Sequence, residues 1–364
     1  MTRPLEVCFV LPSLAVGGAE RVIVNLANGL LAAGHAPRLL LTDAEGPLRA
    51  GLAAGVPVTA LARRSVRAAL PRVIRHVRHR PPDVILSTHT HVNLALSAAR
   101  GLLPRETRLV LREPTHAPLE LEGRSTSAIR RAQHALYRRA DLLLASSRVL
   151  GEDLRSLTNA HVELLMNPVD IAGLRREVTD AQHHPSEGPH EGRRFVAAGR
   201  LTRQKAVEDL LTAFACGAGD DDRLTVFGDG PEREPLMRAI ERLSLTGRVV
   251  MAGVRDDHWA ALASADRFVL ASRREGMPNV VLESLALGTP VVATTDLEML
   301  EELARMAPDG AVDLVERSQL SSAIAETVRR DVTAVPGPSL LPEEFALHAV
   351  AQRLIALLVS LRET

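Results

Sequence analysis

The sequence predicts an α/β protein with two doubly wound, Rossmann-like domains, each built on a parallel sheet. Short apolar runs alternate with longer helical patterns in both halves of the chain. A segment rich in His, Pro and Gly separates the two halves. The length of 364 residues exceeds what one ordinary hydrophobic core accommodates, and two domains of typical size account for it.

The first domain is predicted at residues 1–168. Its strand candidates are rich in Val, Ile and Leu, as expected for a parallel sheet that helices cover on both faces. They lie at residues 5–11, 38–42, 57–61, 84–87, 109–112 and 142–146. Helical patterns fall between them, at residues 19–33, which Gly34 ends, and at residues 125–140, with Ser125 as the expected N-cap.

The alternation resumes after a linker predicted at residues 169–192. Residues 178–192 read VTDAQHHPSEGPHEG and have no apolar periodicity. The second domain, predicted at residues 193–342, has strand candidates at 195–198, 224–227, 249–251, 268–271 and 291–294. A closing helix at residues 343–364 has apolar residues at helical spacing, and it either completes the second domain or crosses back to the first.

Composition excludes several classes of protein. Lysine plus arginine, 44, equals aspartate plus glutamate, 44, so no net charge attracts the chain to nucleic acid. Two cysteines are too few for a disulfide framework or a zinc cluster. No apolar stretch approaches the roughly 20 residues that span a bilayer, and the N-terminal run is shorter than that of a signal peptide. We expect a cytoplasmic protein.

A basic loop follows the first strand candidate of the second domain. Gly199 permits a tight turn there, and Arg200 and Lys205 follow it within one short loop. Arginine offers a planar fork of donors and lysine a point charge, a combination suited to a diphosphate whose negative charge grows as it leaves. From these residues alone, a solvated basic loop is the simpler interpretation.

A second candidate site begins after the strand candidate at 268–271. Asn279 is a suitable N-cap, Gly288 a suitable C′ residue, and Pro290 prevents continuation, so a helix at 279–287 is predicted. Its first amide groups and positive dipole end favour an anion. Glu275 precedes this helix and Glu283 lies one turn inside it. The two carboxylates suggest either paired acid and base work or, for Glu283, a charge on the helix surface.

These motifs resemble those of the retaining, nucleotide-sugar glycosyltransferases of family 4 (glycosyl transferases group 1). Glu275 to Glu283 is similar to the family's motif of two glutamates with seven residues between them, and the Arg200 loop is similar to its phosphate-binding loop. Further similar segments follow in the family's order: residues 17–21, 167–170, 227–231 with Arg233 and Leu236, 247–249 and Gly253. The resemblance implies the GT-B architecture, two Rossmann-like domains facing a central cleft.

The resemblance also implies a role for each site residue. The donor diphosphate would contact Arg200, Lys205, Gly17, Gly18 and Asn279. The donor sugar would contact Glu275, Gly276, Met277 and Pro278, and the ribose would contact Glu283. Glu275 and His116 would be catalytic. The first domain would then select a hydroxyl acceptor, which could be a glycan, a lipid-linked sugar or a small natural product.

The reaction that the resemblance implies keeps the anomeric configuration and needs no metal and no cofactor. A nucleoside-diphosphate sugar, UDP-sugar above others, is the co-substrate. The chain departs from the family pattern at Ala206 and Met277, and at residues 295–298, where a pair of glycines is usual. That last departure leaves open a catalytically silent GT-B protein. The other alternative is a nucleotide-dependent oxidoreductase of doubly wound fold, which would need a Gly-x-Gly-x-x-Gly motif after a first strand, and residues 17–19 do not supply it.

Three other groups of residues carry weaker hypotheses. His89 and His91 follow a strand candidate, but no third ligand accompanies them, so no metal site is expected. Asp220 to Asp222 is interpreted as a solvated turn. Seven arginines between Arg63 and Arg80 favour a helix with an apolar stripe against the sheet, and peripheral contact with an anionic membrane is the alternative.

Overall fold

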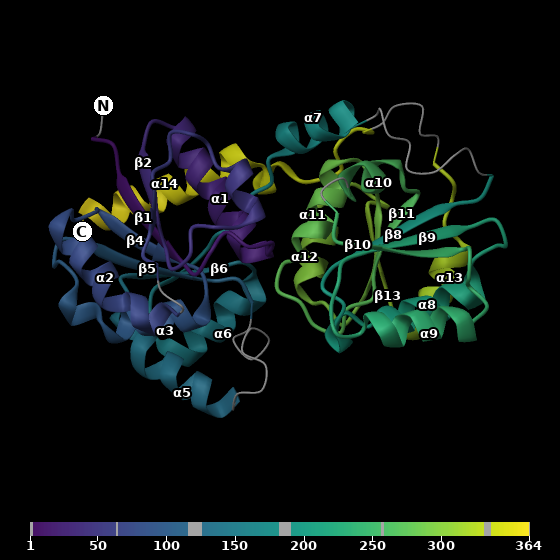
Figure 1. The fold of residues 1–364 in the computed structure, drawn as a ribbon, viewed down its shortest axis with the longest axis horizontal. Helices are drawn as coiled ribbons and strands as arrows, with labels where there is room; N and C mark the ends of the chain where they lie inside the picture. The colour runs from purple at the N-terminus through teal and green to yellow at the C-terminus, as the bar shows by residue number, and fades with distance from the viewer. Residues whose placement is uncertain are drawn as a thin grey trace. The chain divides into compact units, whose positions relative to one another are not determined.

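A computed structural model of the chain describes residues 3–62, 65–115, 126–181, 191–255, 258–330 and 336–363. Contacts between residues divide the chain into two compact units. The first unit is Met1–Val169 together with Glu344–Thr364, and the second is Asp170–Glu343. Each unit has a parallel sheet at its centre and helices on both faces of that sheet (Figure 1).

The described residues of the first unit form a seven-stranded parallel sheet in the order β3-β2-β1-β4-β5-β6-β7. The order reverses direction beside β1, so β1 and β4 are neighbours although two strands separate them in sequence. The strands are β1 (Glu6–Leu11), β2 (Ala36–Leu41), β3 (Val58–Ala60), β4 (Val84–Ser87), β5 (Arg108–Glu113), β6 (Leu142–Ala145) and β7 (Val162–Leu164). Ligands of doubly wound sheets bind outside the carboxyl ends of strands at such a reversal.

Successive residues of β1 enter opposite cores of the first unit. Phe9 packs in one core with the helices α1 (Gly18–Ala32) and α14 (Leu347–Glu363). Cys8 and Val10 pack in the other core, beneath the helices on the second face. These are α2 (Val66–His79), α3 (Thr90–Ala98), α5 (Thr126–Leu136) and α6 (Arg148–Thr158). The described residues also form 3-10 turns at Pro47–Gly51, Arg100–Leu102, Tyr137–Arg139 and Glu343–Phe345.

The closing helix α14 packs in the first unit, although it follows the second unit in sequence. It lies against α1, where a Cβ atom on Gly29 would stand 2.8 Å from the Cβ of Ala351. Val350, Leu354 and Leu358 enter the core on that face of the sheet. The sequence left two positions open for this helix, and the packing selects the one in the first unit.

The described residues of the second unit form a six-stranded parallel sheet in the order β10-β9-β8-β11-β12-β13. Its strands are β8 (Arg194–Ala198), β9 (Arg223–Phe227), β10 (Val249–Gly253), β11 (Arg267–Leu270), β12 (Val291–Thr294) and β13 (Val312–Val315). The order reverses beside β8, so the loops that follow β8 and β11 are adjacent. Both predicted binding loops of this unit follow these two strands.

Helices cover both faces of the second sheet. The core on one face joins the sheet to α8 (Val207–Gly217), α9 (Arg233–Arg242) and α13 (Leu320–Ala325). On the other face α10 (His258–Ser264) and α11 (Asn279–Ala286) contact β8, β11 and β12. Helix α12 (Met299–Met306) precedes β13, and 3-10 turns lie at Arg203–Lys205 (η4) and Arg317–Gln319 (η5).

Part of the segment predicted to be a linker is helical. Residues Ile171–Ala181 form α7, which packs against α10 and α11 of the second unit. Arg175 at its centre donates hydrogen bonds to the carbonyl oxygens of Gly337 (2.5 Å) and Pro336 (3.3 Å). The prediction missed this helix because it assigned all of residues 169–192 to a linker. The polar run at the end of this segment has no apolar periodicity, and the assignment was extended to the residues before it.

Candidate functional site

The loops that follow β8 and β9 pack backbone against backbone, and this contact requires glycine. Gly199 and Gly228 have φ angles of +152° and +123°, which side chains other than glycine rarely adopt. A Cβ atom on Gly228 would lie 1.9 Å from the carbonyl oxygen of Gly199. The tight turn that the sequence predicted at Gly199 is present, and it brings Arg200 and Lys205 to the carboxyl end of β8.

Lys205 forms an ion pair with Glu275, with 2.5 Å between its Nζ and Oε1 of the glutamate. The side chains keep 20% and 11% of their exposure, so the pair is partly shielded from water. Such a pair positions both side chains, because separating the charges at a partly desolvated site is costly. The sequence singled out each residue but not their contact, which joins the loop after β8 to the loop after β11.

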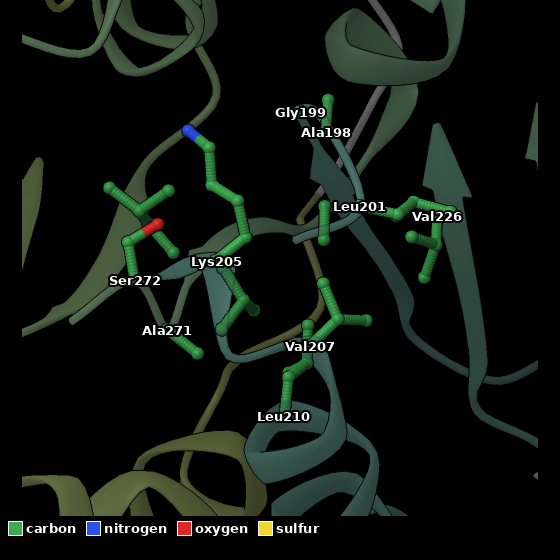
Figure 2. A pocket seen from close by; sticks show the side chains of 12 residues that line it. Ala198, Gly199, Leu201, Lys205, Val207, Leu210, Val226, Ala271 and Ser272 are labelled. Carbon is green, nitrogen blue, oxygen red and sulfur yellow. The ribbon is translucent and has the colours of Figure 1, made fainter. Parts of the chain in front are cut away.

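A small pocket lies at the base of Lys205, with room for about one water molecule at roughly 20 Å³. Figure 2 shows the Lys205 side chain with its nitrogen turned away from Val207 and Leu210. Ala271 and Ser272, which follow β11, form part of the wall. The Ser272 hydroxyl is buried and has no hydrogen-bond partner within the described residues. The pocket therefore has an apolar floor and a polar rim.

Arg200 stands apart from this ion pair. Its side chain is exposed and, within the part of the chain that the structure describes, makes no hydrogen bond or ion pair. A guanidinium in this condition binds an incoming phosphate without first giving up a protein partner. Lys205, by contrast, must exchange Glu275 for such a ligand.

The N-cap of helix α11 lies one residue before the predicted one. Pro278 occupies the N-cap position with an extended backbone and no side-chain cap bond, and Asn279 is the first helical residue. The prediction of Asn279 as the cap was wrong because Pro278, with its fixed φ of −74°, already makes the turn into the helix. The side chain of Met277, which precedes this turn, is buried and forms part of the hydrophobic core. The first-turn amides remain a suitable site for an anion.

Glu283 is buried on α11 and contacts two aromatic residues that the sequence analysis missed. The Trp259 indole Nε1 donates to Glu283 Oε2 at 3.3 Å, and His258 Nε2 lies 3.9 Å from the same oxygen. The His258 ring lies between those of Trp259 and Phe227, with centroids 4.8 and 6.2 Å away. Because Trp259 is the chain's single tryptophan, its position after a strand could have drawn attention to it.

In the first unit, the glycine pair begins α1 and accommodates a carboxylate. Gly17 is in the cap position, and a Cβ atom there would lie 2.1 Å from Oε2 of Glu20. Glu20 Oε1 lies 3.1 Å from Nε2 of His89, which precedes α3 at the end of β4. The loop with Gly17 and Gly18 thus lies beside a glutamate and histidine pair. The predicted catalytic residue His116 lies outside the described residues.

A buried polar network lies at the carboxyl end of β5, and the sequence analysis did not predict it. Glu113 accepts hydrogen bonds from Thr90 (2.9 Å), Asn93 (2.8 Å) and the Tyr137 hydroxyl. Burial, and then the Glu113 charge, raise the pKa of Tyr137, so it remains a hydrogen-bond donor. Burial lowers the pKa of the adjacent Arg112 to about 10, although Glu113 opposes the shift.

The loop at residues 295–298 carries the departure from the family pattern. Asp296 in this loop accepts a 2.5 Å hydrogen bond from Arg317. The loop thus has a charged partner within the second unit.

Two other predictions concern charged clusters. Asp222 is buried rather than solvated, because it accepts hydrogen bonds from the backbone and side chain of Arg193. Burial raises the pKa of Asp222, but the bonds from Arg193 and from the Gly219 amide outweigh it and leave the pKa below its ordinary value. Across the described ranges, no three His, Cys, Asp or Glu side chains gather as metal ligands would.

Two family profiles match most of the chain. Residues 16–172 match the profile described as Glycosyltransferase Family 4, and residues 192–332 match the one described as Glycosyl transferases group 1. The chain belongs to the family 4 glycosyltransferases. The family membership expected from the sequence motifs is thereby confirmed, and the oxidoreductase alternative is set aside.

Individual family 4 relatives are similar over parts of the chain. A glycosyltransferase of Methanocaldococcus jannaschii is 25% identical over 240 residues, which cover 61% of this chain and 58% of the relative. The lipopolysaccharide core biosynthesis glycosyltransferase LpsE of Rhizobium meliloti is 34% identical over 170 residues, 45% of this chain and 49% of the relative. The matched part thus spans about half the length of these relatives.

The fold matches that of solved glycosyltransferase structures along the whole chain. The HepE protein of Anabaena, in complex with UDP and glucose, superposes with a TM-score of 0.72 at 19% identity over 99% of this chain and 97% of that one. The two parallel-sheet domains of the GT-B fold, expected from the sequence, are confirmed. The described helices of this family 4 member include none with the length and apolar character needed to cross a bilayer.

Proposed function

We propose that the chain transfers a hexosyl group from a nucleoside-diphosphate sugar to a hydroxyl acceptor, with retention of configuration and without a metal ion. A UDP-sugar is the proposed donor, because the structurally similar HepE protein has been captured with UDP and glucose. The observation that carries the proposal is the ion pair of Lys205 and Glu275 beside the first turn of α11. It joins a phosphate-binding cation and a sugar-binding carboxylate at one sheet edge.

In this proposal the donor replaces Glu275 as the partner of Lys205. The diphosphate takes the ammonium group, the Arg200 fork and the first-turn amides around Asn279. Glu275 is then released to accept hydrogen bonds from the sugar, which rests against Gly276, Met277 and Pro278. The ammonium, guanidinium and amide groups stabilise the negative charge that develops on the leaving diphosphate. Stabilisation of this kind is usually the largest single contribution of such a site to catalysis.

The nucleoside would extend toward Glu283. One Glu283 oxygen is held by Trp259, which fixes the orientation of the carboxylate, and the ribose hydroxyl groups would bond to this oriented group. Its burial makes a hydrogen bond to a ligand stronger than the same bond in water. The proposed donor contacts therefore come from the segments after β8 and β11, and the segment after β10 orients one of them.

The acceptor would bind to the first unit. Gly17 and Gly18, the adjacent Glu20 and His89 pair, and His116 are the proposed contacts, because hydroxyl groups bond readily to carboxylate and imidazole groups. A lipid-linked sugar is one acceptor class. Contact with an anionic membrane surface through the arginines of α2 would then bring the protein to it.

The test compares Arg200→Ala/Lys205→Ala with Arg203→Ala, a matched control on the same loop whose side chain is 93% exposed. Calorimetric titration with UDP should show an affinity loss of about 100-fold or more for the double variant and little change for the control. The fluorescence of Trp259 gives a second signal of binding near Glu283. Unchanged UDP affinity in the double variant would contradict the proposed donor site.

A second experiment separates an active enzyme from a catalytically silent protein. Turnover of UDP-, GDP- and ADP-sugars is measured with and without a chelator, and the product's anomeric configuration is read by NMR. We expect turnover of a UDP-sugar with retention, equally fast with chelator. Binding without turnover of any donor would favour the silent alternative, and loss of activity in chelator would contradict the metal-free mechanism.

A further inference from the structure

Arg317 lies at the centre of a cluster of charges in the second unit. It is the first residue of η5, after β13. Its guanidinium forms ion pairs with Asp209 of α8 at 2.9 Å and with Asp296, which follows β12, at 2.5 Å. Asp209 also pairs with Arg273 at 3.0 Å. Two arginines therefore balance two aspartates within this cluster.

The same guanidinium supports the wall of the pocket at Lys205. Arg317 donates hydrogen bonds to the carbonyl oxygens of Ala271 at 2.8 Å and Ser272 at 3.4 Å. Both residues line the pocket in Figure 2. The backbone at these two residues thus links the charge cluster to the wall of the space at the base of Lys205.

The segment that Arg317 supports leads directly to Glu275. Within this segment, the Arg273 amide donates to the carbonyl oxygen of Gln204 at 2.8 Å, and the Gln204 side chain donates to the carbonyl oxygen of Arg274 at 2.7 Å. Arg317 holds the start of this segment, and the loop with Lys205 holds the rest. The position of Glu275 thus depends on contacts with both.

Asp296 would be unfavourable for a diphosphate if it had no partner. An unpaired carboxylate near an anion site repels the ligand. Asp296 keeps 48% of its exposure and Arg317 28%, so the pair itself adds little to folding stability. The pair can still affect a bound anion, because the anion responds to the net charge of Asp296 and Arg317 together.

We propose that Arg317 is a positioning and charge-compensating residue of the donor site. It cancels the negative charge of Asp296 and fixes the backbone that leads to Glu275. The departure of residues 295–298 from the family's glycine pair is then compatible with a diphosphate donor, because this chain supplies the compensating cation itself. The inference rests on the proposed function, in which UDP occupies the site above Lys205.

The experiment uses the full chain and three variants: Arg317→Ala, Asp296→Asn, and the two combined. Affinities for UDP and for uridine, which has no phosphate, are measured by calorimetry. In Arg317→Ala the Kd for UDP should rise about tenfold while that for uridine changes less than about twofold, because only the diphosphate experiences the uncovered charge. Adding Asp296→Asn should restore UDP affinity, and Asp296→Asn alone should not weaken it.

Three outcomes would overturn this inference. UDP affinity that is unchanged in Arg317→Ala would show that the cluster has no effect on the site. Equal losses for UDP and uridine, or a double variant that binds no better than Arg317→Ala, would indicate loss of structure instead of uncovered charge. Thermal unfolding of each variant identifies misfolding. If the unaltered protein binds neither UDP nor uridine, the proposed function fails instead.

Discussion

At the scale of single residues, the candidate donor site is held by ion pairs that a ligand must rearrange. Lys205 is paired with Glu275, whereas the Arg200 side chain has no partner in the described part of the chain. The first contact with an anion therefore costs nothing at Arg200 but requires an exchange at Lys205. Removing the charge of Glu275 should therefore change the affinity of the site for an anion through Lys205.

Glu275→Gln should change binding and turnover in opposite directions. Loss of its charge leaves Lys205 without a counterion, so UDP should bind about three- to tenfold more tightly. The hydrogen bonds to the sugar weaken, and kcat should fall by roughly 100-fold. Calorimetry with UDP and steady-state kinetics with the active donor test the two effects. Parallel losses of affinity and turnover would contradict the proposed exchange.

The buried thiol of Cys8 makes stability depend on alkaline pH. Burial raises its pKa from 9.0 to about 11, although Arg38 opposes the shift. Between these values the unfolded chain loses the thiol proton and the folded chain keeps it, so stability falls as pH rises. The loss is about 2 kcal/mol at pH 11, where the thiol of the folded chain is itself half ionised.

Cys8→Ala provides the control for this effect. The other titrating groups are common to both proteins, so the difference in their free energies of unfolding isolates the thiol. Chemical denaturation at pH 8 and pH 10.5 should show the unaltered protein losing stability relative to Cys8→Ala. A difference that does not vary with pH would mean that the thiol of the folded protein ionises normally.

At the scale of elements, α2 separates its apolar and basic faces. Val66, Ala69, Val73 and Val77 are buried in the core, so no apolar stripe remains for insertion into lipid. Arg67, Arg75 and Arg78 are exposed, and the helix contains no acidic residue. The sequence interpretation of a helix packed on the sheet is thus correct for Val66–His79, while Arg63 and Arg64 lie outside the described residues.

Membrane contact through α2 would therefore be electrostatic. We expect sedimentation with vesicles containing anionic lipid at low salt, its loss at about 0.5 M salt, and none with neutral vesicles. Changing Arg67, Arg75 and Arg78 together to Gln should abolish it and alter stability by less than about 1 kcal/mol, because these side chains lie outside the core. Salt-resistant binding to neutral vesicles would contradict this account.

At the scale of the whole molecule, the chain enters the second unit after Val169 and returns at Glu344 to complete the first. The returning helix α14 covers α1 and contributes to the core beneath it. The first unit is consequently discontinuous in sequence, and its stability depends on the last residues of the chain.

Deletion of residues 344–364 should therefore affect the two units differently. Amide hydrogen exchange in β1 and α1 should accelerate strongly, because α14 no longer covers their core. Exchange in β8 and β11, and affinity for UDP, should remain close to those of the full chain. Mass spectrometry locates the change, and an equal acceleration in both units would contradict the division.

Local patterns in the sequence predicted the fold class and the residues of the candidate donor site. Strand periodicity, glycines at tight turns, and polar motifs at strand ends act over a few residues, so they can be recognised without a structure. Gly199, with its positive φ, and the helix at Asn279 are examples. The helix α7 was missed because the polar run after it dominated the composition of its segment.

The contacts of the site were decided by tertiary structure alone. Lys205 and Glu275 are 70 residues apart, and Arg317 is 108 residues from Asp209. No local pattern specifies such partners, because they meet only when parallel strands bring their carboxyl ends to one edge. The sequence thus determined two α/β domains and the chemistry of their loops. The packing determined which charges face one another, and to which domain the final helix belongs.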